Sequence, residues 1–268
     1  MQKLSKIPAP ALAGVVKEKN VAQAIAGIRN CAYGGATMID LHLPCLENSD
    51  VESLRSIITS SSLPVLALNY QATNDDEAEA ARVESLLRAV EAGAAGIDIQ
   101  GYTLHYPSKY NFCGEDKYSF TKGAPKEVVT DPAIIEKQCA LIERVHSMGA
   151  EVLLSCHPRI AMSSTQVVEL ALFLQERSPD IIKIVTSAEN EDDLMESIRA
   201  MTMLKQEVKT PVSYHVNGKM GKLSRIINPL LGGQIAFCVE RYVEGSDVEQ
   251  VELRTAKAVL DNVRRILI

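Results

Sequence analysis

The sequence predicts a single (β/α)8 barrel, and three observations favour this α/β fold class. The chain has 268 residues, which is within the usual span of one such barrel. Short apolar runs alternate with longer amphipathic stretches from one end of the chain to the other, as in repeated βα units. Most of the short runs lack polar alternation, which is typical of parallel strands buried on both faces. We therefore expect residues 1–268 to form one barrel domain.

Eight apolar runs are expected to be the barrel strands. In chain order they are Ala11–Val16, Thr37–Leu43, Val65–Tyr70, Gly96–Gln100, Glu151–Cys156, Ile181–Val185, Val212–Val216 and Gln234–Val239. An open doubly wound sheet is the alternative arrangement of such runs. It is disfavoured because no GxGxxG motif follows the first run.

Helical spacing is clearest in two of the intervening segments. After Asn190, apolar residues recur every three or four positions as far as Leu204, and a similar series runs from Leu253 to Leu267. Glu189 and the acidic residues after Asn190 cluster where the first of these helices would begin, which suits the positive end of a helix dipole.

One long segment, residues 101–130, interrupts the alternation. It contains four of the eight tyrosines and two of the four phenylalanines. Because it follows the fourth predicted strand, it should leave the barrel at the C-terminal, catalytic face. Long loops in compact domains are often lids or binding loops. A surface excursion or an oligomer contact is the alternative interpretation.

Composition excludes several classes of partner. The net charge is −6 and no lysine or arginine cluster forms a footprint for nucleic acid. No run of 18 or more apolar residues would span a membrane, and the N-terminal residues do not form a secretory signal. The six cysteines include no CxxC pair, so reduced thiols and a cytoplasmic location are expected. The expected partner is a small-molecule substrate, and a homodimer is possible.

Lys183 is the most unusual residue at the predicted catalytic face. It lies inside the apolar run IIKIV, where strand propensity and burial both disfavour a charged side chain. Burial favours the neutral amine, which can attack a carbonyl carbon. Alternatively, the side chain reaches the strand end or pairs with a nearby acid.

Two further residues strengthen the case for chemistry at this face. His157 ends the strand before that of Lys183, where it could transfer protons near neutral pH. Arg225, in the segment after the seventh strand, has a side chain suited to a substrate carboxylate. Taken singly, the histidine could be structural and the arginine could lie on a helix surface. Lys183 and His157 on consecutive strands are more specific than either residue alone.

These segments together resemble the type I 3-dehydroquinate dehydratase family. LLSCHPR is similar to the family strand that ends in the catalytic histidine, and DIIKIVTSAENEDDL is similar to the strand with the Schiff-base lysine. GKMGKLSRI resembles the family's Met-Gly…Ser-Arg motif. The resemblance implies a (β/α)8 barrel and a hydro-lyase of the shikimate pathway that needs no cofactor. It also implies catalytic roles for Lys183 and His157, with Arg225 binding the substrate carboxylate.

The N-terminal half departs from the family pattern at substrate-binding positions. Asp40 and His42 stand where the family has Glu-x-Arg, Tyr70 stands where it has an arginine, and the acid that supports the histidine falls near Asn74. The loop after the eighth strand, which includes Asp247, lacks the family's Ser-Ala-Pro-Gly-Gln pattern. We expect Asp40, His42, Tyr70 and Asp247 to contact the substrate. The ligand should be less anionic than 3-dehydroquinate, or should differ in its hydroxyl groups.

Three other functions remain open from the sequence. A lysine iminium also supports retro-aldol cleavage, as in class I aldolases. Asp40 and His42 lie on one face of a strand and could bind a divalent metal with His215, with Asp98 as a further candidate ligand. A barrel that has lost activity could instead bind a ligand without catalysis. Dehydration through Lys183 and His157 is the preferred hypothesis.

Overall fold

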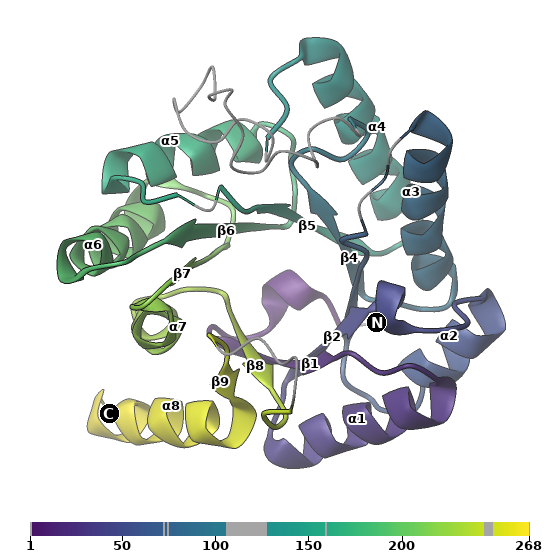
Figure 1. The fold of residues 1–268 in the computed structure, drawn as a ribbon, viewed down its shortest axis with the longest axis horizontal. Helices are drawn as coiled ribbons and strands as arrows, with labels where there is room; N and C mark the ends of the chain where they lie inside the picture. Colours follow the sequence, from purple (N-terminus) through teal and green to yellow (C-terminus); the bar gives the residue numbers. More distant parts are fainter. Residues whose placement is uncertain are drawn as a thin grey trace.

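A computed structural model describes residues 2–71, 73, 75–105, 128–158, 160–243 and 249–267. Most of the predicted insertion 101–130, as well as Asn74 and Asp247, lies outside these residues. Within them, parallel strands curl into a near-barrel and helices cover its outer face (Figure 1). The predicted α/β barrel class is confirmed.

Strands and helices alternate through the described chain. The strands are β1 (Ala11–Val16), β2 (Met38–His42), β3 (Val65–Leu68), β4 (Gly96–Gln100), β5 (Glu151–Cys156), β6 (Ile181–Ser187), β7 (Val212–Asn217), β8 (Ile235–Val239) and β9 (Val251–Glu252). The α-helices are α1 (Val21–Gly34), α2 (Val51–Ile58), α3 (Asp76–Glu91), α4 (Pro132–Ser147), α5 (Ser164–Gln175), α6 (Glu191–Glu207), α7 (Gly221–Leu230) and α8 (Leu253–Leu267). Two 3-10 helices, η1 (Leu4–Lys6) and η2 (Leu43–Cys45), complete the described elements.

The eight predicted strands correspond to β1–β8, with ends that differ by two residues at most. β9 was not predicted, because a pair of residues carries no periodic signal. All strand pairs are parallel, in the order β7-β6-β5-β4-β3-β2-β1-β8-β9. The ring closes at the start of β7 and β8, where the Gln234 amide donates to the Val212 carbonyl at 2.8 Å.

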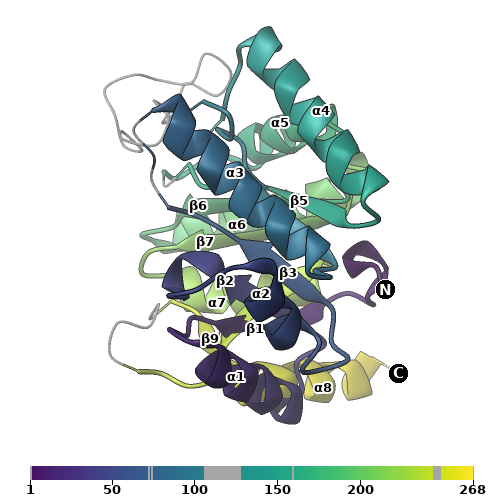
Figure 2. The same cartoon turned by 90° about the vertical axis from the view of Figure 1, so that its right-hand side faces the viewer.

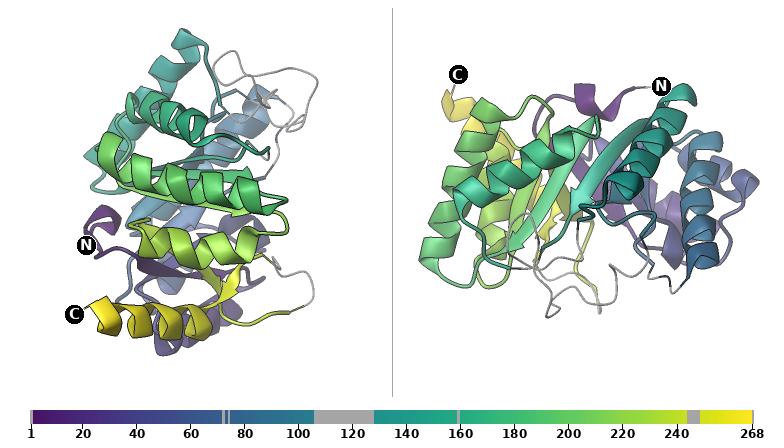
Figure 3. Two further views of the ribbon diagram at one scale, coloured as in Figure 1. Left: turned by 90° about the vertical axis from the view of Figure 1, so that its left-hand side faces the viewer. Right: turned by 90° about the horizontal axis from the view of Figure 1, so that it is seen from above.

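Side-chain caps fix where several helices begin. Asn20, Asp50 and Asp75 each accept a hydrogen bond from a backbone amide in the first turn of α1, α2 and α3 respectively. Asn190 caps α6 in the same way, and the helix begins at the acidic residues that indicated its start. Figure 3 shows α5, α6 and α7 side by side on the outside of the sheet. No helix among the described residues is long and apolar enough to cross a membrane.

The barrel interior changes from apolar to polar along its axis. At the N-terminal ends of the strands, η1 closes the barrel and Leu4 packs with Met38, Leu66, Leu153 and Ile181. Figure 2 shows η1 and the end of α8 at this same end of the molecule. Several of the next inward positions towards the C-terminal ends are polar, namely Asp40, Asp98, Lys183 and His215. The sheet therefore presents its polar side chains at the catalytic face.

Candidate active site at the barrel mouth

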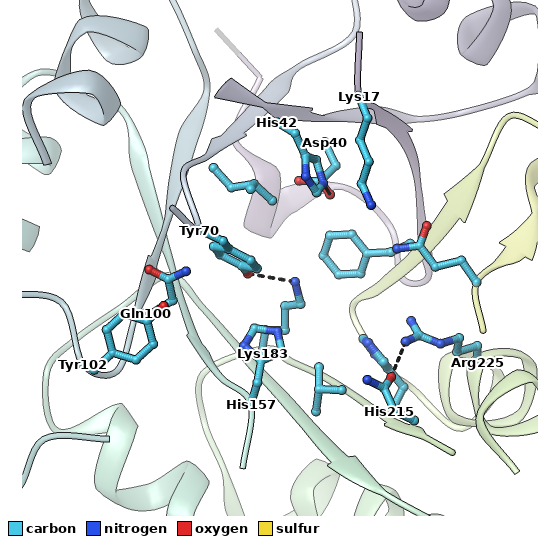
Figure 4. A pocket seen from close by; sticks show the side chains of 15 residues that line it. Lys17, Asp40, His42, Tyr70, Gln100, Tyr102, His157, Lys183, His215 and Arg225 are labelled. Carbon is cyan, nitrogen blue, oxygen red and sulfur yellow. Dashed lines mark hydrogen bonds and ion pairs between the residues drawn. The ribbon is translucent and has the colours of Figure 1, made fainter. Parts of the chain in front are cut away.

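A cavity of about 260 Å³ opens at the C-terminal ends of the strands. Every strand from β1 to β8 contributes to it, either from the strand itself or from the residue that follows (Figure 4). Its lining comprises Lys17, Asp40, His42, Leu68, Tyr70, Gln100, Tyr102, His157, Lys183, Val185, His215, Asn217, Arg225, Phe237 and Gln250. It therefore collects most of the polar residues that the sequence placed at strand ends.

Lys183 projects from the middle of β6 into this cavity and is only 6% exposed. Its strand neighbours at the same level are Ser155 on β5 and Ser213 on β7, which are small enough to leave space around the amine. Lys183 Nζ lies 4.3 Å from the centre of the Phe237 ring and 3.5 Å from Asp98 Oδ2. The aromatic face and the carboxylate compensate an ammonium that is removed from water.

Tyr70 joins Lys183 to Asp98. The lysine Nζ donates to the Tyr70 hydroxyl at 3.1 Å, and this hydroxyl donates to Asp98 Oδ2 at 2.5 Å. Ser155 Oγ lies 3.2 Å from the same hydroxyl oxygen. Burial, and then the Asp98 charge, raise the pKa of Tyr70 well above its usual value of 10, so the phenol keeps its proton.

Asp98 is fully buried on β4. Burial raises its pKa, and this effect outweighs the opposing influence of the Lys183 cation and the hydrogen bonds from Ser155 and Tyr70. Asp98 Oδ1 has no hydrogen-bond partner among the described residues. This carboxyl group is therefore able to take up a proton more readily than an ordinary aspartate.

His157 follows β5 directly and lies on the same side of the cavity as Lys183 (Figure 4). Its ring meets the Tyr70 ring edge-on, with 5.3 Å between ring centres and 72° between ring planes. Its side chain is partly exposed, whereas that of Lys183 is buried, and both line the cavity. A ligand bound at the amine would therefore lie within reach of an imidazole.

Arg225 and His215 form the wall next to Lys183, because β7 pairs directly with β6. Arg225, on α7, is 8% exposed and donates to Asn217 Oδ1 at 2.7 Å. His215 is buried on β7, and its pKa is well below the usual 6.5 because of burial and of the nearby charges of Arg225 and Lys183. A neutral imidazole thus lies between two cations, which is a suitable setting for an anionic ligand group.

Asp40, His42 and Lys17 line the β1–β2 side. Asp40 is buried, and its Oδ2 lies 3.3 Å from His42 Nε2. Lys17 immediately follows β1, is exposed, and extends its amine toward the cavity (Figure 4). Lys17 therefore adds a further cation to the cavity, on the side of β1.

A buried ion pair supports the remaining wall, formed by Gln100 and Tyr102. Arg82 on α3 makes two hydrogen bonds to Glu79, at 2.7 and 3.1 Å, and both residues are 3% exposed. The same guanidinium donates to Gln100 Oε1 and Thr103 Oγ1, each at 3.0 Å. The turn that carries Tyr102 is thereby tied to α3.

A sequence model of the family described as Type I 3-dehydroquinase matches residues 126–266, which is just over half of the chain. The chain belongs to the type I 3-dehydroquinase family. The match includes His157, Lys183 and Arg225, and it does not extend to Asp40, His42 and Tyr70, at which the N-terminal half departs from the family pattern. Among curated proteins, no relative of this sequence was found.

Solved structures of dehydroquinases have the same fold. The 3-dehydroquinate dehydratase of Geobacillus kaustophilus matches with a TM-score of 0.75 at 12% identity, covering 98% of this chain and 96% of that one. The type I enzyme of Clostridium difficile matches with a TM-score of 0.75 at 15% identity, covering 99% of this chain and 98% of that one. The Enterococcus faecalis enzyme matches with a TM-score of 0.69 at 15% identity, covering 98% of this chain and 99% of that one. At these identities the likeness is one of fold.

The structure brings together most of the site residues that the sequence suggested for a dehydroquinase-like barrel. Lys183, His157, Arg225, Asp40, His42 and Tyr70 all line the one cavity, whereas Asp247 lies outside the described residues. The alternative metal set does not assemble, since no three His, Cys, Asp or Glu side chains in the described part of the chain are placed to hold an ion. Asp40, His42 and His215 thus share a cavity without forming a ligand cluster.

Sequence reasoning missed three features of this dehydroquinase-family site. Asp98 was considered only as a metal ligand, although it contacts Lys183. Lys17 was overlooked, and its position directly after the first predicted strand was the available signal. Gln250 lies beyond the eighth strand and carries no signal in the sequence.

Proposed function

We propose that this chain is a Schiff-base-forming lyase that dehydrates a cyclic hydroxy-keto acid, 3-dehydroquinate or a related compound, with residues 1–268 acting as one catalytic domain. The observation that carries the proposal is the Lys183 amine, buried at the barrel mouth and open to a cavity that His157 also lines. Family membership supports the same reaction class.

Lys183 supplies the nucleophile. Its neutral amine adds to the substrate ketone, and loss of water from the carbinolamine gives an iminium. The iminium withdraws electrons from the adjacent carbon and acidifies its protons. The protein itself supplies the electron sink in this scheme, so no organic cofactor or metal takes part in the proposed step.

His157 moves the protons of the elimination. Its imidazole takes the proton from the carbon next to the iminium, which gives an enamine. It returns that proton to the departing β-hydroxyl group, so that water leaves and a conjugated iminium forms. Hydrolysis then releases the enone and regenerates the Lys183 amine.

Arg225 and Lys17 define the class of substrate. The Arg225 guanidinium is held by Asn217 and is suited to a carboxylate through paired hydrogen bonds. Lys17 adds a cation on the β1–β2 side of the cavity, where Asp40 and His42 can bind hydroxyl groups. This arrangement favours a compact hydroxylated ring with a carboxylate and a ketone.

Reductive trapping tests the proposal. The protein is incubated with 3-dehydroquinate and borohydride, intact mass is recorded, and the modified peptide is mapped. We expect one adduct on Lys183, and none in the Lys183→Ala variant. Comenic acid, present in covalently modified form in the Clostridium difficile structure, provides a second probe.

The product distinguishes the reaction types. Without borohydride, a dehydratase produces an enone with unchanged carbon count, whereas an aldolase breaks a carbon–carbon bond. An adduct on a lysine other than Lys183, or full activity in Lys183→Ala, would contradict the mechanism. Absence of both adduct and turnover across a set of cyclic hydroxy-keto acids would favour a ligand-binding barrel.

A further inference from the structure

Tyr70 and Asp98 are placed to do more than line the cavity. The Tyr70 hydroxyl accepts from Lys183 Nζ and donates to Asp98 Oδ2, so one phenol connects the amine to a fully buried carboxyl group. Tyr70 follows the end of β3, whereas Asp98 and Lys183 lie inside β4 and β6, and the three side chains form a continuous line of exchangeable protons. His157 contacts Tyr70 through its ring edge.

We propose that Tyr70 and Asp98 form a proton relay that activates Lys183 and then drives iminium formation, with Tyr70 as the catalytic group at the amine and Asp98 as the proton store. The inference rests on the proposed Schiff-base function and adds a second acid–base device to it. It separates the protons of iminium formation from those of the elimination, which belong to His157.

The relay has two balanced proton transfers. In the first, the Lys183 ammonium passes a proton to the Tyr70 oxygen while Tyr70 passes its own proton to the Asp98 carboxylate. The amine and the acid are then both neutral, and the phenol is unchanged. The amine nitrogen forms a bond to the ketone carbon, and its surplus proton moves to the former carbonyl oxygen.

The second transfer moves a proton along the relay in the opposite direction and ends on the carbinolamine hydroxyl. Asp98 returns its proton through Tyr70 to the carbinolamine hydroxyl, the carbon–oxygen bond breaks, and water leaves. The nitrogen lone pair forms the carbon–nitrogen double bond. The net change converts an ammonium and a ketone into an iminium and water. The iminium cation then lies beside the Asp98 carboxylate, where the Lys183 ammonium lay before the reaction.

Geometry and electrostatics both support this relay. The hydroxyl of a carbinolamine is attached to the carbon bonded to Nζ, so it forms within reach of a phenol that lies 3.1 Å from that nitrogen. Burial, with a smaller contribution from the Asp40 charge, raises the pKa of Asp98, which makes the neutral acid accessible. Ser155 borders the phenol and keeps its oxygen hydrogen-bonded during the exchange.

Reductive methylation with formaldehyde and cyanoborohydride tests the relay without a specific substrate. Formaldehyde forms the same carbinolamine and iminium at Lys183, and mass mapping measures methylation of that residue. The rate is followed from pH 6 to pH 10, with reductant in sufficient excess that iminium formation is limiting. The variants are Tyr70→Phe, Asp98→Asn and the double variant. Tyr214→Phe is the control, since its buried hydroxyl bonds only to Thr186 in the described structure.

We expect the limiting rate at Lys183 to fall about 100-fold or more in each single variant, the range for loss of a general acid–base group. The double variant should be no slower than the slower single variant, because both residues serve one relay. Tyr214→Phe should keep the wild-type rate. Thermal unfolding identifies any variant that fails to fold, and Tyr70→Phe alone is then decisive.

Other outcomes would overturn the relay. They are wild-type rates in both variants, a shift only in the pH at which the rate rises, or a wild-type Lys183 that does not react with formaldehyde. Failure of the proposed function is distinguishable. If Lys183 reacts with formaldehyde in a Tyr70-dependent manner and never with cyclic hydroxy-keto acids, the relay holds and the substrate class is wrong. If 3-dehydroquinate is trapped equally by wild type and Tyr70→Phe, the function holds and the relay is wrong.

Discussion

Replacement of Arg82 by methionine should show how much the buried support of the active-site wall contributes to stability. Arg82 donates to Glu79, to Gln100, to Thr103 and, at 2.9 Å, to the Asn69 carbonyl. Methionine fills much of the same volume but offers none of these bonds. The variant therefore leaves the Glu79 carboxylate buried without its cation.

The magnitude follows from what remains around Glu79. Its oxygens keep hydrogen bonds from Thr73 Oγ1 at 2.9 Å and from the Leu104 amide at 2.8 Å. Breaking a buried ion pair typically costs about 3–5 kcal/mol. Since two donors remain, we expect a loss near the lower end, about 3 kcal/mol. In a domain of this size that corresponds to a fall in Tm of roughly 6–12 °C.

Urea and thermal unfolding measure this loss, and the chain offers a matched control. Arg199 and Glu196 on α6 form an ion pair with the same three-residue spacing and the same 2.7 Å distance, but the Arg199 side chain is 65% exposed. Arg199→Met should cost less than about 1 kcal/mol. Adding Glu79→Gln to Arg82→Met should recover part of the loss, because no uncompensated charge then remains. Equal losses in Arg82→Met and Arg199→Met would refute the reasoning that burial sets the cost.

Two further predictions concern His215 and Arg225. The unfolded chain protonates His215 near pH 6.5, whereas burial and neighbouring cations keep it neutral in the fold to well below that pH. The contribution of neutral His215 to the free energy of unfolding is therefore fully present above pH 6.5 and is lost as the pH falls below it. Between pH 8 and pH 5, urea titrations of His215→Gln should show a decrease in the free energy of unfolding that is smaller than that of the wild type by up to about 2 kcal/mol. An unchanged pH dependence in the variant would contradict this. Arg225→Lys keeps the charge but loses the planar donor fork, so calorimetry should show binding of a cyclic keto acid weakened about 10- to 100-fold. The methyl ester of that acid, which lacks the carboxylate, is the control ligand, and equal weakening for acid and ester would argue against carboxylate binding.

The candidate site could be predicted only in part, and the reason is physical. Lys183 was identifiable because a charged residue inside an apolar strand costs free energy and so needs an explanation. His157 gained weight because consecutive parallel strands end at the same edge. Asp98 gave no comparable signal, since an acidic residue within a short strand can face either side of the sheet. Its contact with Lys183 joins β4 to β6, which are not neighbouring strands.

The buried pair of Arg82 and Glu79 was equally invisible in the sequence. Both lie on α3, whose first turn is rich in charged residues, as on many solvated helices. Their burial depends on the turn at Gln100–Leu104 folding back over that helix, and local periodicity does not encode such a contact. The sequence shows that Asp40, His42 and Tyr70 differ from the residues typical of the family, but it does not show which side chains surround them.

The sequence by itself determined the order of the eight main strands and their helices, the barrel class and the strand that carries Lys183. These properties depend on local hydrophobic period and on the rule that parallel strands expose their C-terminal ends together. The tertiary structure alone decided that Tyr70, separated from Lys183 by 113 positions, links its amine to Asp98. It also decided that Lys17 and Arg225 line the same cavity. Curling of the sheet sets these distances, because closure of the barrel brings inward-facing side chains from non-neighbouring strands to one axis.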